Sequence, residues 1–300
     1  MDVVLLTLAD AGSGHGERVP VLRCRDALRD GGADVETRTA TSDREIDEVL
    51  QRQAEGARLI VAAESDGQVR AVMRRMMRRY ADPPSRRSPT LPDDRTLPDL
   101  PTIGILPLDP TGPCGASSPE GVTDLADRLG LPRSPEEVAA AVLSGRERRV
   151  DLLRNDGGSL TLHGALVGGT DEAGRMVTWR ARIEVDDAVL SDGREPLLAC
   201  AVANADGYAD LDELPLVTTA DPADGVLNVG VAVPVYNVGR FGFGLLQRRR
   251  FRIEVRRAKG RAVAITPREH VPCLDDGVAT TLTRKRTWWM ERAAWAVYTS

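Results

Sequence analysis

The chain has 300 residues, enough for one large domain or two of ordinary size. Its 42% hydrophobic and 28% charged residues are typical of a soluble globular protein, and no apolar run reaches the roughly 18 to 20 residues of a membrane span. A net charge of −5 offers no general basic field for nucleic acid. The chain opens directly on an apolar run with no signal-like segment before it, so we expect a cytoplasmic protein.

The first half alternates between strand-like and helix-like segments. Strands are predicted over residues 3–8, 35–39, 59–63 and 102–107, and helices over 19–30, 43–53, 69–80, 122–129 and 134–144. Gly31 and Gly32 end the first helix, while Ser42 and Ser134 are suited to cap the second and the last. This order predicts a mostly parallel sheet covered by helices on both faces.

Two stretches of this half lack apolar periodicity. Residues 81–101 are rich in Pro, Ser, Asp and Arg and are expected to form a surface loop that is either ordered or disordered. Residues 109–121 form a second irregular stretch.

From about Arg148 the pattern changes to a period of two. Strands are predicted over residues 161–166, 177–185, 197–203, 226–235, 250–256 and 261–266. Turn residues separate several of them: Asp192-Gly193, Asp224-Gly225 and Lys259-Gly260. The predicted fold is therefore an N-terminal α/β domain (1–145), an antiparallel β-sandwich or barrel (146–285), and a C-terminal segment (286–300).

The end of the strand at 59–63 is the most informative local feature. Glu64-Ser65-Asp66-Gly67-Gln68 follows a buried strand and precedes a helix. Open α/β sheets place ligands at the carboxyl ends of their strands, so this turn is a candidate binding loop. An Asp-Gly pair is also an ordinary turn former, and a solvated turn is the alternative interpretation of Asp66.

The cysteines and histidines indicate no metal centre. The four cysteines are scattered without a C-x-x-C pair, which argues against a structural zinc site and a disulfide framework and favours reduced, partly buried thiols. The three histidines, His15, His163 and His270, have no metal-ligand spacing, so core or surface positions are expected for each.

Four short motifs along the chain form a recognisable series. They are Asp10-Ala11-Gly12-Ser13-Gly14, then Glu64–Gln68 with Ala71 on the following helix, then Pro107-Leu108 with Thr123–Gly130, and finally Asp276-Gly277-Val278. In this order they resemble motifs of the diacylglycerol kinase family, which includes bacterial lipid kinases and sphingosine kinases. The third motif is split by an insertion at residues 109–118. The resemblance covers nearly the whole chain.

This resemblance implies a specific site. It implies an α/β nucleotide domain and a β-sandwich with the active site in the cleft between them, and a final strand, 294–298, that returns to the first domain. ATP and Mg²⁺ are the implied cofactors, and a lipid or lipid-like hydroxyl is the implied phosphoryl acceptor. Asp276 corresponds to the general base, and Asp66 to a residue that organises the metal and the nucleotide. Ser13, Gly14, Gly67 and Gln68 complete the implied nucleotide site.

The departures from the family pattern leave a second hypothesis open. The paired glycines that let backbone N–H groups cradle phosphate are missing, Glu64 puts a carboxylate near the expected polyphosphate, and Gln68 replaces a hydroxyl. Phosphoryl transfer depends on positioning and charge neutralisation, so these losses are costly. The alternative is an inactive pseudo-kinase that binds a lipid, nucleotide or protein partner in the cleft.

Basic and aromatic segments raise one further hypothesis. Residues 73–80 and 284–289 combine arginine or lysine with apolar or aromatic residues, as segments at anionic membrane surfaces do. The favoured interpretation of 73–80 is a helix packed on the sheet with its arginines in solvent. Trp288 and Trp295 are expected in the core.

Overall fold

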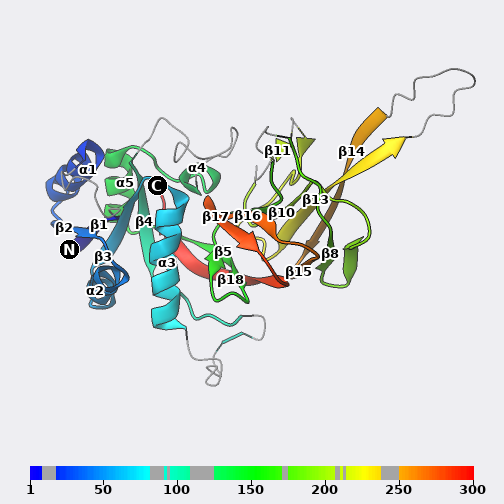
Figure 1. Cartoon of the computed structure of the whole chain (residues 1–300). Coiled ribbons are helices and arrows are strands. Elements are labelled where there is room, and N and C mark those ends of the chain that lie inside the picture. Colours follow the sequence, from blue (N-terminus) through cyan, green and yellow to red (C-terminus); the bar gives the residue numbers. More distant parts are fainter. Residues whose placement is uncertain are drawn as a thin grey trace, which may run out of the picture.

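The computed structural model describes residues 1–8, 18–81, 91–92, 95–108, 125–170, 175–206, 210–211, 214–237 and 250–300. An α/β part and a β-rich part lie side by side, with the two described chain ends in the α/β part (Figure 1). The first part contains β1 (Asp2–Leu8), α1 (Val19–Asp30), β2 (Asp34–Ala40), α2 (Asp43–Ala54), β3 (Arg58–Ala63), α3 (Asp66–Tyr80), β4 (Thr102–Pro107), α4 (Leu125–Arg128) and α5 (Pro135–Ser144).

The second part is almost entirely strand. It contains β5 (Glu147–Asn155), β6 (Leu160–Thr161), β7 (Gly164–Val167), β8 (Ala181–Val185), β9 (Ala188–Asp192), β10 (Ala199–Ala203), β11 (Asp210–Leu211), β12 (Leu214–Pro215), β13 (Leu227–Asn237), β14 (Arg250–Gly260), β15 (Ala262–Pro267), β16 (Val271–Asp275), β17 (Val278–Leu282) and β18 (Arg286–Tyr298). The predicted fold class, a parallel α/β unit followed by an antiparallel β unit, is confirmed.

Strands β2, β1, β3 and β4 form the parallel part of the first sheet. Side chains alternate between its two faces, because successive residues of a strand point in opposite directions. Val4 and Leu6 pack with α2 and α3, whereas Val3 and Leu5 pack with α1 and α5. Both faces are therefore buried, which explains the continuous apolar runs in these strands.

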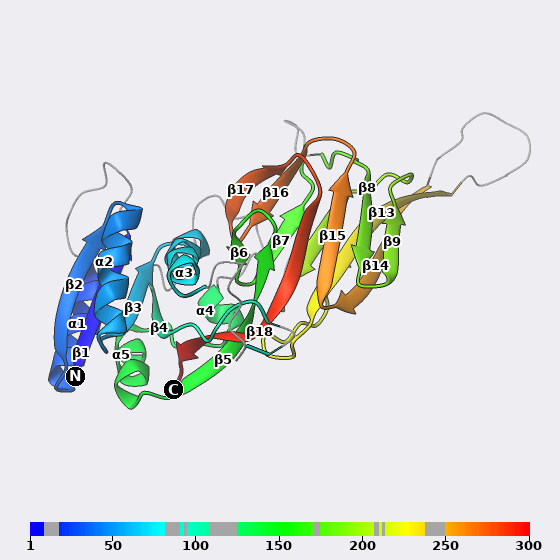
Figure 2. The same ribbon diagram turned by 90° about the horizontal axis from the view of Figure 1, so that it is seen from below.

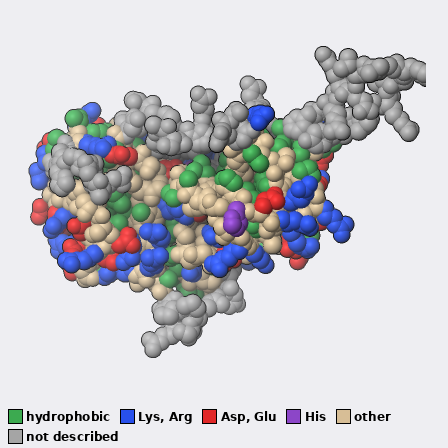
Figure 3. All heavy atoms as spheres, in the orientation of Figure 1, with side chains coloured by type: hydrophobic (Ala, Val, Ile, Leu, Met, Phe, Trp, Pro, Cys, Tyr) green, Lys and Arg blue, Asp and Glu red, His purple; other side chains and the backbone are tan. Residues whose placement is uncertain are grey.

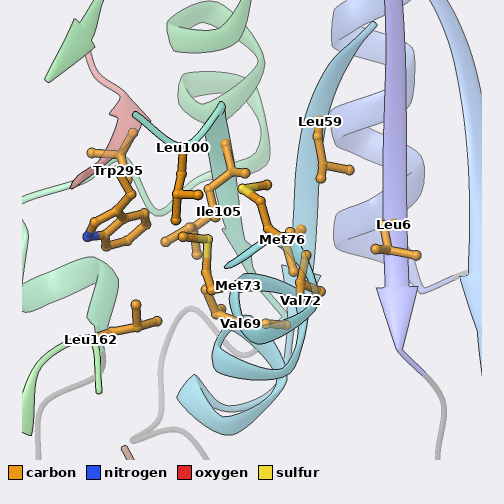
Figure 4. Packing of buried hydrophobic residues seen from close by; sticks show 14 of the residues in the cluster. Leu6, Leu59, Val69, Val72, Met73, Met76, Leu100, Ile105, Leu162 and Trp295 are labelled. Carbon is orange, nitrogen blue, oxygen red and sulfur yellow. The ribbon is translucent and has the colours of Figure 1, made fainter. Parts of the chain in front are cut away.

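Helix α3 contributes much of the first core. Val69, Val72, Met73 and Met76 point toward β3, β4 and the C-terminal strand, in line with their spacing of three and four residues (Figure 4). Ser42 and Ser134 both form complete capping boxes at the starts of α2 and α5, as their positions predicted.

The last strand ties the two parts together. β18 pairs in parallel with β4 of the α/β part through Ala296 and Val297, and antiparallel with β5 and β15 of the β-rich part. One ten-stranded sheet thus runs through both parts, which is visible from below (Figure 2). Trp288 lies in one core and Trp295 in the other, and both are fully buried, as predicted.

A six-stranded antiparallel sheet in the order β14-β13-β10-β7-β16-β17 completes the second part. The core between it and the β18-β15-β8-β9 end of the first sheet contains mainly Val and Leu side chains together with Trp179 and Trp288. The opposite face of the six-stranded sheet is covered by a smaller apolar cluster that includes Leu216 and Val217.

Several local predictions were wrong. Helix α3 begins at Asp66, so the Asp-Gly pair forms its first turn and is not a loop. The strand expected over 161–166 is divided into β6 and β7, and the strand expected over 177–185 begins only at Ala181. The 81–101 segment is not entirely a surface loop, because Leu97 and Leu100 in its described part are buried in the core. Two hydrogen bonds from backbone N–H groups hold them there: the Leu97 N–H donates to the Glu291 carboxylate, and the Leu100 N–H donates to the Ala294 carbonyl.

Candidate functional site

Asp66 lies at the first position of α3 and faces the second part of the molecule. It is 9% exposed, so its interpretation as a solvated turn residue is wrong. Its Oδ1 accepts the backbone N–H of Leu125, at the start of α4, over 2.9 Å. A carboxylate at this position also interacts favourably with the positive end of the helix dipole.

Asp276 occupies the tight turn between β16 and β17. Asp276 and Gly277 have φ angles of 47° and 77°, which the two-residue hairpin requires and which Asp-Gly adopts readily. The side chain is fully buried, and its carboxylate accepts the backbone N–H groups of Leu162 (2.7 Å), His163 (3.0 Å) and Gly164 (3.2 Å). These bonds replace sheet pairing there, which is why the predicted strand over 161–166 is interrupted.

His163 lies between the two aspartates. Its Nε2 is 3.5 Å from Asp66 Oδ2 and 3.6 Å from Asp276 Oδ1, and its side chain is 1% exposed. A protonated His163 would form an ion pair with both carboxylates. The structure thus brings Asp66 of the first part and Asp276 of the second onto one buried imidazole.

A second buried ion pair adjoins this group. Arg70, one turn beyond Asp66 on α3, donates from Nη2 to Asp275 Oδ2 over 2.6 Å, and its Nε lies 3.6 Å from Asp276 Oδ2. Thr161 Oγ1 donates to Asp275 Oδ1 over 2.7 Å. Burial and the adjacent Asp276 carboxylate raise the pKa of Asp275 to about 7, although Arg70 and Thr161 act in the opposite direction.

The loop before α3 is closed by its own hydrogen bonds. The Glu64 backbone N–H donates to Gln68 Oε1 over 2.8 Å, and the Glu64 carboxylate forms an ion pair with Arg18. A Cβ on Gly67 would lie 2.9 Å from Val278 Cγ2, so the β16–β17 turn packs directly on this end of α3. The backbone N–H groups of Glu64 and Gln68, which could otherwise donate to a phosphate, are therefore used within the loop.

The described residues do not fit a magnesium ion at Asp66. Mg²⁺ takes six oxygen ligands in octahedral geometry and is usually held through one or two carboxylates, waters and substrate phosphates, so the engagement of the Asp66 carboxylate decides the fit. In the described ranges no group of three or more His, Cys, Asp and Glu could hold a metal. One Asp66 oxygen already accepts an amide, and the other faces the His163 imidazole.

The predicted site residues have different outcomes. Asp66, Gly67 and Asp276 meet where α3 contacts the β16–β17 turn, while Gln68 turns back to its own loop. Ser13 and Gly14 lie outside the described residues. Sequence reasoning missed the positions of Arg70, His163 and Asp275. Asp275 has the one visible signal, its place beside Asp276, whereas nothing in the spacing of Arg70 or His163 points to this cluster.

The arginines of α3 are mostly engaged by α2. Arg75 pairs with Asp43 and Asp47, and Arg79 donates to Gln51. Over the face that carries these helices, basic and acidic side chains are interspersed (Figure 3). This arrangement agrees with a helix packed on the sheet and gives no support to α3 as a membrane-binding surface.

Three of the four cysteines, Cys24, Cys200 and Cys273, are described, and all are buried free thiols. Burial raises the pKa of Cys24 to about 12, so this side chain stays an unreactive thiol at neutral pH. Cys114 lies outside the described residues. No helix in the described part of the chain is long and apolar enough to cross a membrane.

Comparisons with known proteins identify the family. The family model described as the diacylglycerol kinase catalytic domain matches residues 2–155. A diacylglycerol kinase from Bacillus anthracis strain Sterne has a crystal structure similar to this chain, with a TM-score of 0.63 and 15% identity over 100% of this chain and 97% of that one.

A second structure from the same strain, described provisionally as a diacylglycerol kinase, has a TM-score of 0.64 and 14% identity with the same coverage. No curated protein matches the chain. On the match to the family model, which spans more than half of the sequence, the chain belongs to the diacylglycerol kinase family.

Proposed function

We propose that this protein is a non-catalytic member of the diacylglycerol kinase family, a cytoplasmic pseudo-kinase that binds a lipid without phosphorylating it. The observation that carries the proposal is the state of Asp276. A general base must come within hydrogen-bond reach of the hydroxyl that it deprotonates. The Asp276 carboxylate is fully buried and already accepts three backbone N–H groups.

The nucleotide side of the site supports the same proposal. Glu64 lies in the loop where the family binds polyphosphate, its carboxylate forms an ion pair with Arg18, and Gln68 accepts its backbone N–H. Asp66 is held by the Leu125 amide and the His163 ring. Phosphoryl transfer needs preorganised positive charge and free donors around the phosphates, and these described residues do not supply them.

In this proposal the retained aspartates have a structural role. Asp66, His163 and Asp276 join α3 to the β16–β17 turn, and the Arg70–Asp275 pair supports the same contact. Buried charges of this kind fix one arrangement of two packed parts because either partner alone would be strongly destabilising. The two-part body is thereby kept as a binding scaffold.

The second candidate is an ATP- and Mg²⁺-dependent lipid kinase. One observation favours it: Asp66 and Asp276 come from different parts of the chain and both lie within 3.6 Å of the same His163 nitrogen. Catalytic contacts are often loose or misaligned before substrate binds. Family membership also favours an acceptor with a lipid-like hydroxyl.

A transfer assay separates the two candidates. Purified full-length protein is incubated with labelled ATP, Mg²⁺ and mixed micelles that contain diacylglycerol, monoacylglycerol or sphingosine, and labelled lipid is quantified. We expect no transfer above the no-protein background. In parallel, thermal stability is measured with and without ATP and Mg²⁺, and with each lipid.

The variants decide how a signal is interpreted. Asp276→Asn removes the proposed base, and Asp187→Asn changes an exposed aspartate on the turn between β8 and β9 as a matched control. Transfer that survives in the control but is lost in Asp276→Asn would overturn the non-catalytic proposal. Absence of any stabilisation by the lipid panel would contradict the binding role.

A further inference from the structure

The outer face of the six-stranded sheet contains a cavity that the proposed function does not use. Its volume is about 220 Å³, and it lies between strands β13 and β14 and the segment that crosses them. The residues that line it are Leu216, Val217, Thr218, Thr219, Asn228, Val229, Arg257, Ala258 and Lys259. None of them belongs to the Asp66–His163–Asp276 group.

The wall of the cavity is held firmly in place. The backbone of Leu216 lies so close to β13 that a Cβ on Gly230 would overlap its carbonyl oxygen. Arg257 donates from Nε to that oxygen over 3.0 Å and from Nη2 to the Pro215 carbonyl over 2.5 Å. Leu216 and Val217 are buried and form an apolar side of the cavity.

Asn228 is the polar group that points to a ligand. Its side chain is 5% exposed, and its Nδ2 has no hydrogen-bond partner in the described part of the chain. A buried amide donor without a partner is destabilising because it has given up its hydrogen bonds to water. The side chain lines the cavity with its Nδ2 just beneath the accessible surface, so a ligand there accepts this hydrogen bond once the amide turns outward.

The charged and hydroxyl groups around Asn228 define what that ligand is. Lys259 lies directly opposite Asn228 on β14, and side chains of opposed residues share one face of a sheet. Arg257 follows on the same face, and Thr218 and Thr219 supply two hydroxyls. Among the described residues that line the cavity there is no carboxylate.

We propose that this cavity binds a phosphate monoester. A phosphate group carries about −1.5 to −2 charges at neutral pH and has three strong acceptor oxygens. The cavity matches this with two cations and with donors on three segments, residues 218–219, 228 and 257–259. Its size suits a small group such as a glycerol phosphate, and the apolar side formed by Leu216 and Val217 accepts the carbon part.

This site is independent of the kinase question. In the sheet register, Asn228 pairs with Ala203, and Ala203 pairs with Gly164, whose amide binds Asp276. Two strand spacings, roughly 10 Å, therefore separate Asn228 from that row of β7. Binding here leaves the carboxylates of Asp66 and Asp276 untouched, so loss of one site does not test the other.

The proposal is tested by titration calorimetry of the full-length protein with inorganic phosphate and with glycerol 3-phosphate. Sedimentation with vesicles of phosphatidylcholine, alone or with phosphatidic acid, tests whether the phosphate belongs to a lipid. Asn228→Ala and Lys259→Gln are compared with Arg252→Gln, an exposed residue of β14 that does not line the cavity. Acetate is the control anion.

We expect binding of a phosphate probe to weaken about tenfold or more in each cavity variant, as loss of one hydrogen bond to a charged group implies, and to be unchanged in Arg252→Gln. Binding of glycerol 3-phosphate identifies a soluble source, and binding confined to vesicles with phosphatidic acid identifies a lipid source. No binding of any phosphate probe, equal binding of acetate, or full binding by both cavity variants overturns the proposal.

Discussion

At the scale of single residues, Asp276 distinguishes a structural role from a catalytic one. Its carboxylate accepts three backbone N–H groups from residues 162–164 in a fully buried position. Catalytic groups are often held at a cost in stability, so their replacement commonly stabilises a protein. Replacement of a residue that accepts three buried N–H groups should instead destabilise the protein.

We therefore expect Asp276→Ala to lower the free energy of unfolding by about 3–5 kcal/mol, because the amides lose their acceptor and the φ of 47° no longer suits the residue. Urea denaturation followed by circular dichroism measures the change, and Asp187→Asn is the control. Asp276→Asn keeps the turn preference and one acceptor oxygen, so its free energy of unfolding should lie between those of Asp276→Ala and the control. Unchanged or increased stability in Asp276→Ala would mean that these hydrogen bonds do not hold the site.

The neighbouring Asp275 gives a pH dependence whose sign can be worked out. Its pKa rises from 3.8 to about 7 on folding, mainly because of burial and the Asp276 carboxylate. Between these values the folded state holds more protons than the unfolded state, so stability falls as pH rises. The contribution is complete below about pH 4 and lost above about pH 7.

Asp275→Asn should remove this slope. Relative to the variant, the wild type should lose up to about 4 kcal/mol of unfolding free energy between pH 4 and pH 7, since one pKa unit is worth about 1.4 kcal/mol. Denaturant midpoints at closely spaced pH values measure the difference, and the variant serves as the baseline for all other titrating groups. Parallel stability curves for the two proteins would show that Asp275 does not titrate in this range.

At the scale of secondary-structure elements, the sequence was a good guide wherever local interactions decide. The capping boxes at Ser42 and Ser134 involve residues three positions apart, and both helices begin where predicted. Continuous apolar runs likewise located most of the parallel strands of the first part. These features depend on residues close together in the chain, so they can be predicted without knowing the fold.

The elements that were mispredicted are those shaped by distant partners. The break between β6 and β7 depends on a carboxylate more than 110 residues further along the chain. Asp66 starts α3 instead of forming a loop, and its carboxylate reaches the amide of Leu125, 59 residues away. The periodicity of the sequence does not encode such contacts. His163 likewise belongs to the site only through contacts with the distant residues Asp66 and Asp276. The candidate site was thus found through its two aspartates, while the residues that connect them were not.

At the scale of the whole molecule, the domain limits predicted from the sequence stay a prediction, but one structural fact bears on how the parts behave. β18 carries Trp288 into the core of the second part and Trp295 into that of the first, and the same sheet runs through both. Two parts that share a strand and buried ion pairs cannot separate without exposing the cores of both parts to water. We infer that the chain unfolds as one cooperative unit.

This inference predicts the effect of Trp295→Ala. Trp295 is fully buried and donates from Nε1 to the Asp151 carbonyl over 3.0 Å, so its loss should cost about 3–5 kcal/mol. Hydrogen exchange should show an equal loss of protection in β3 and β4 of the first part and in β10 and β13 of the second, because cooperative units open together. Trp288→Ala is the matched variant on the other side of β18 and should produce the same pattern. Loss of protection confined to the mutated side in each variant would show that the parts unfold independently, and the buried aspartates would then not act as the joint between them.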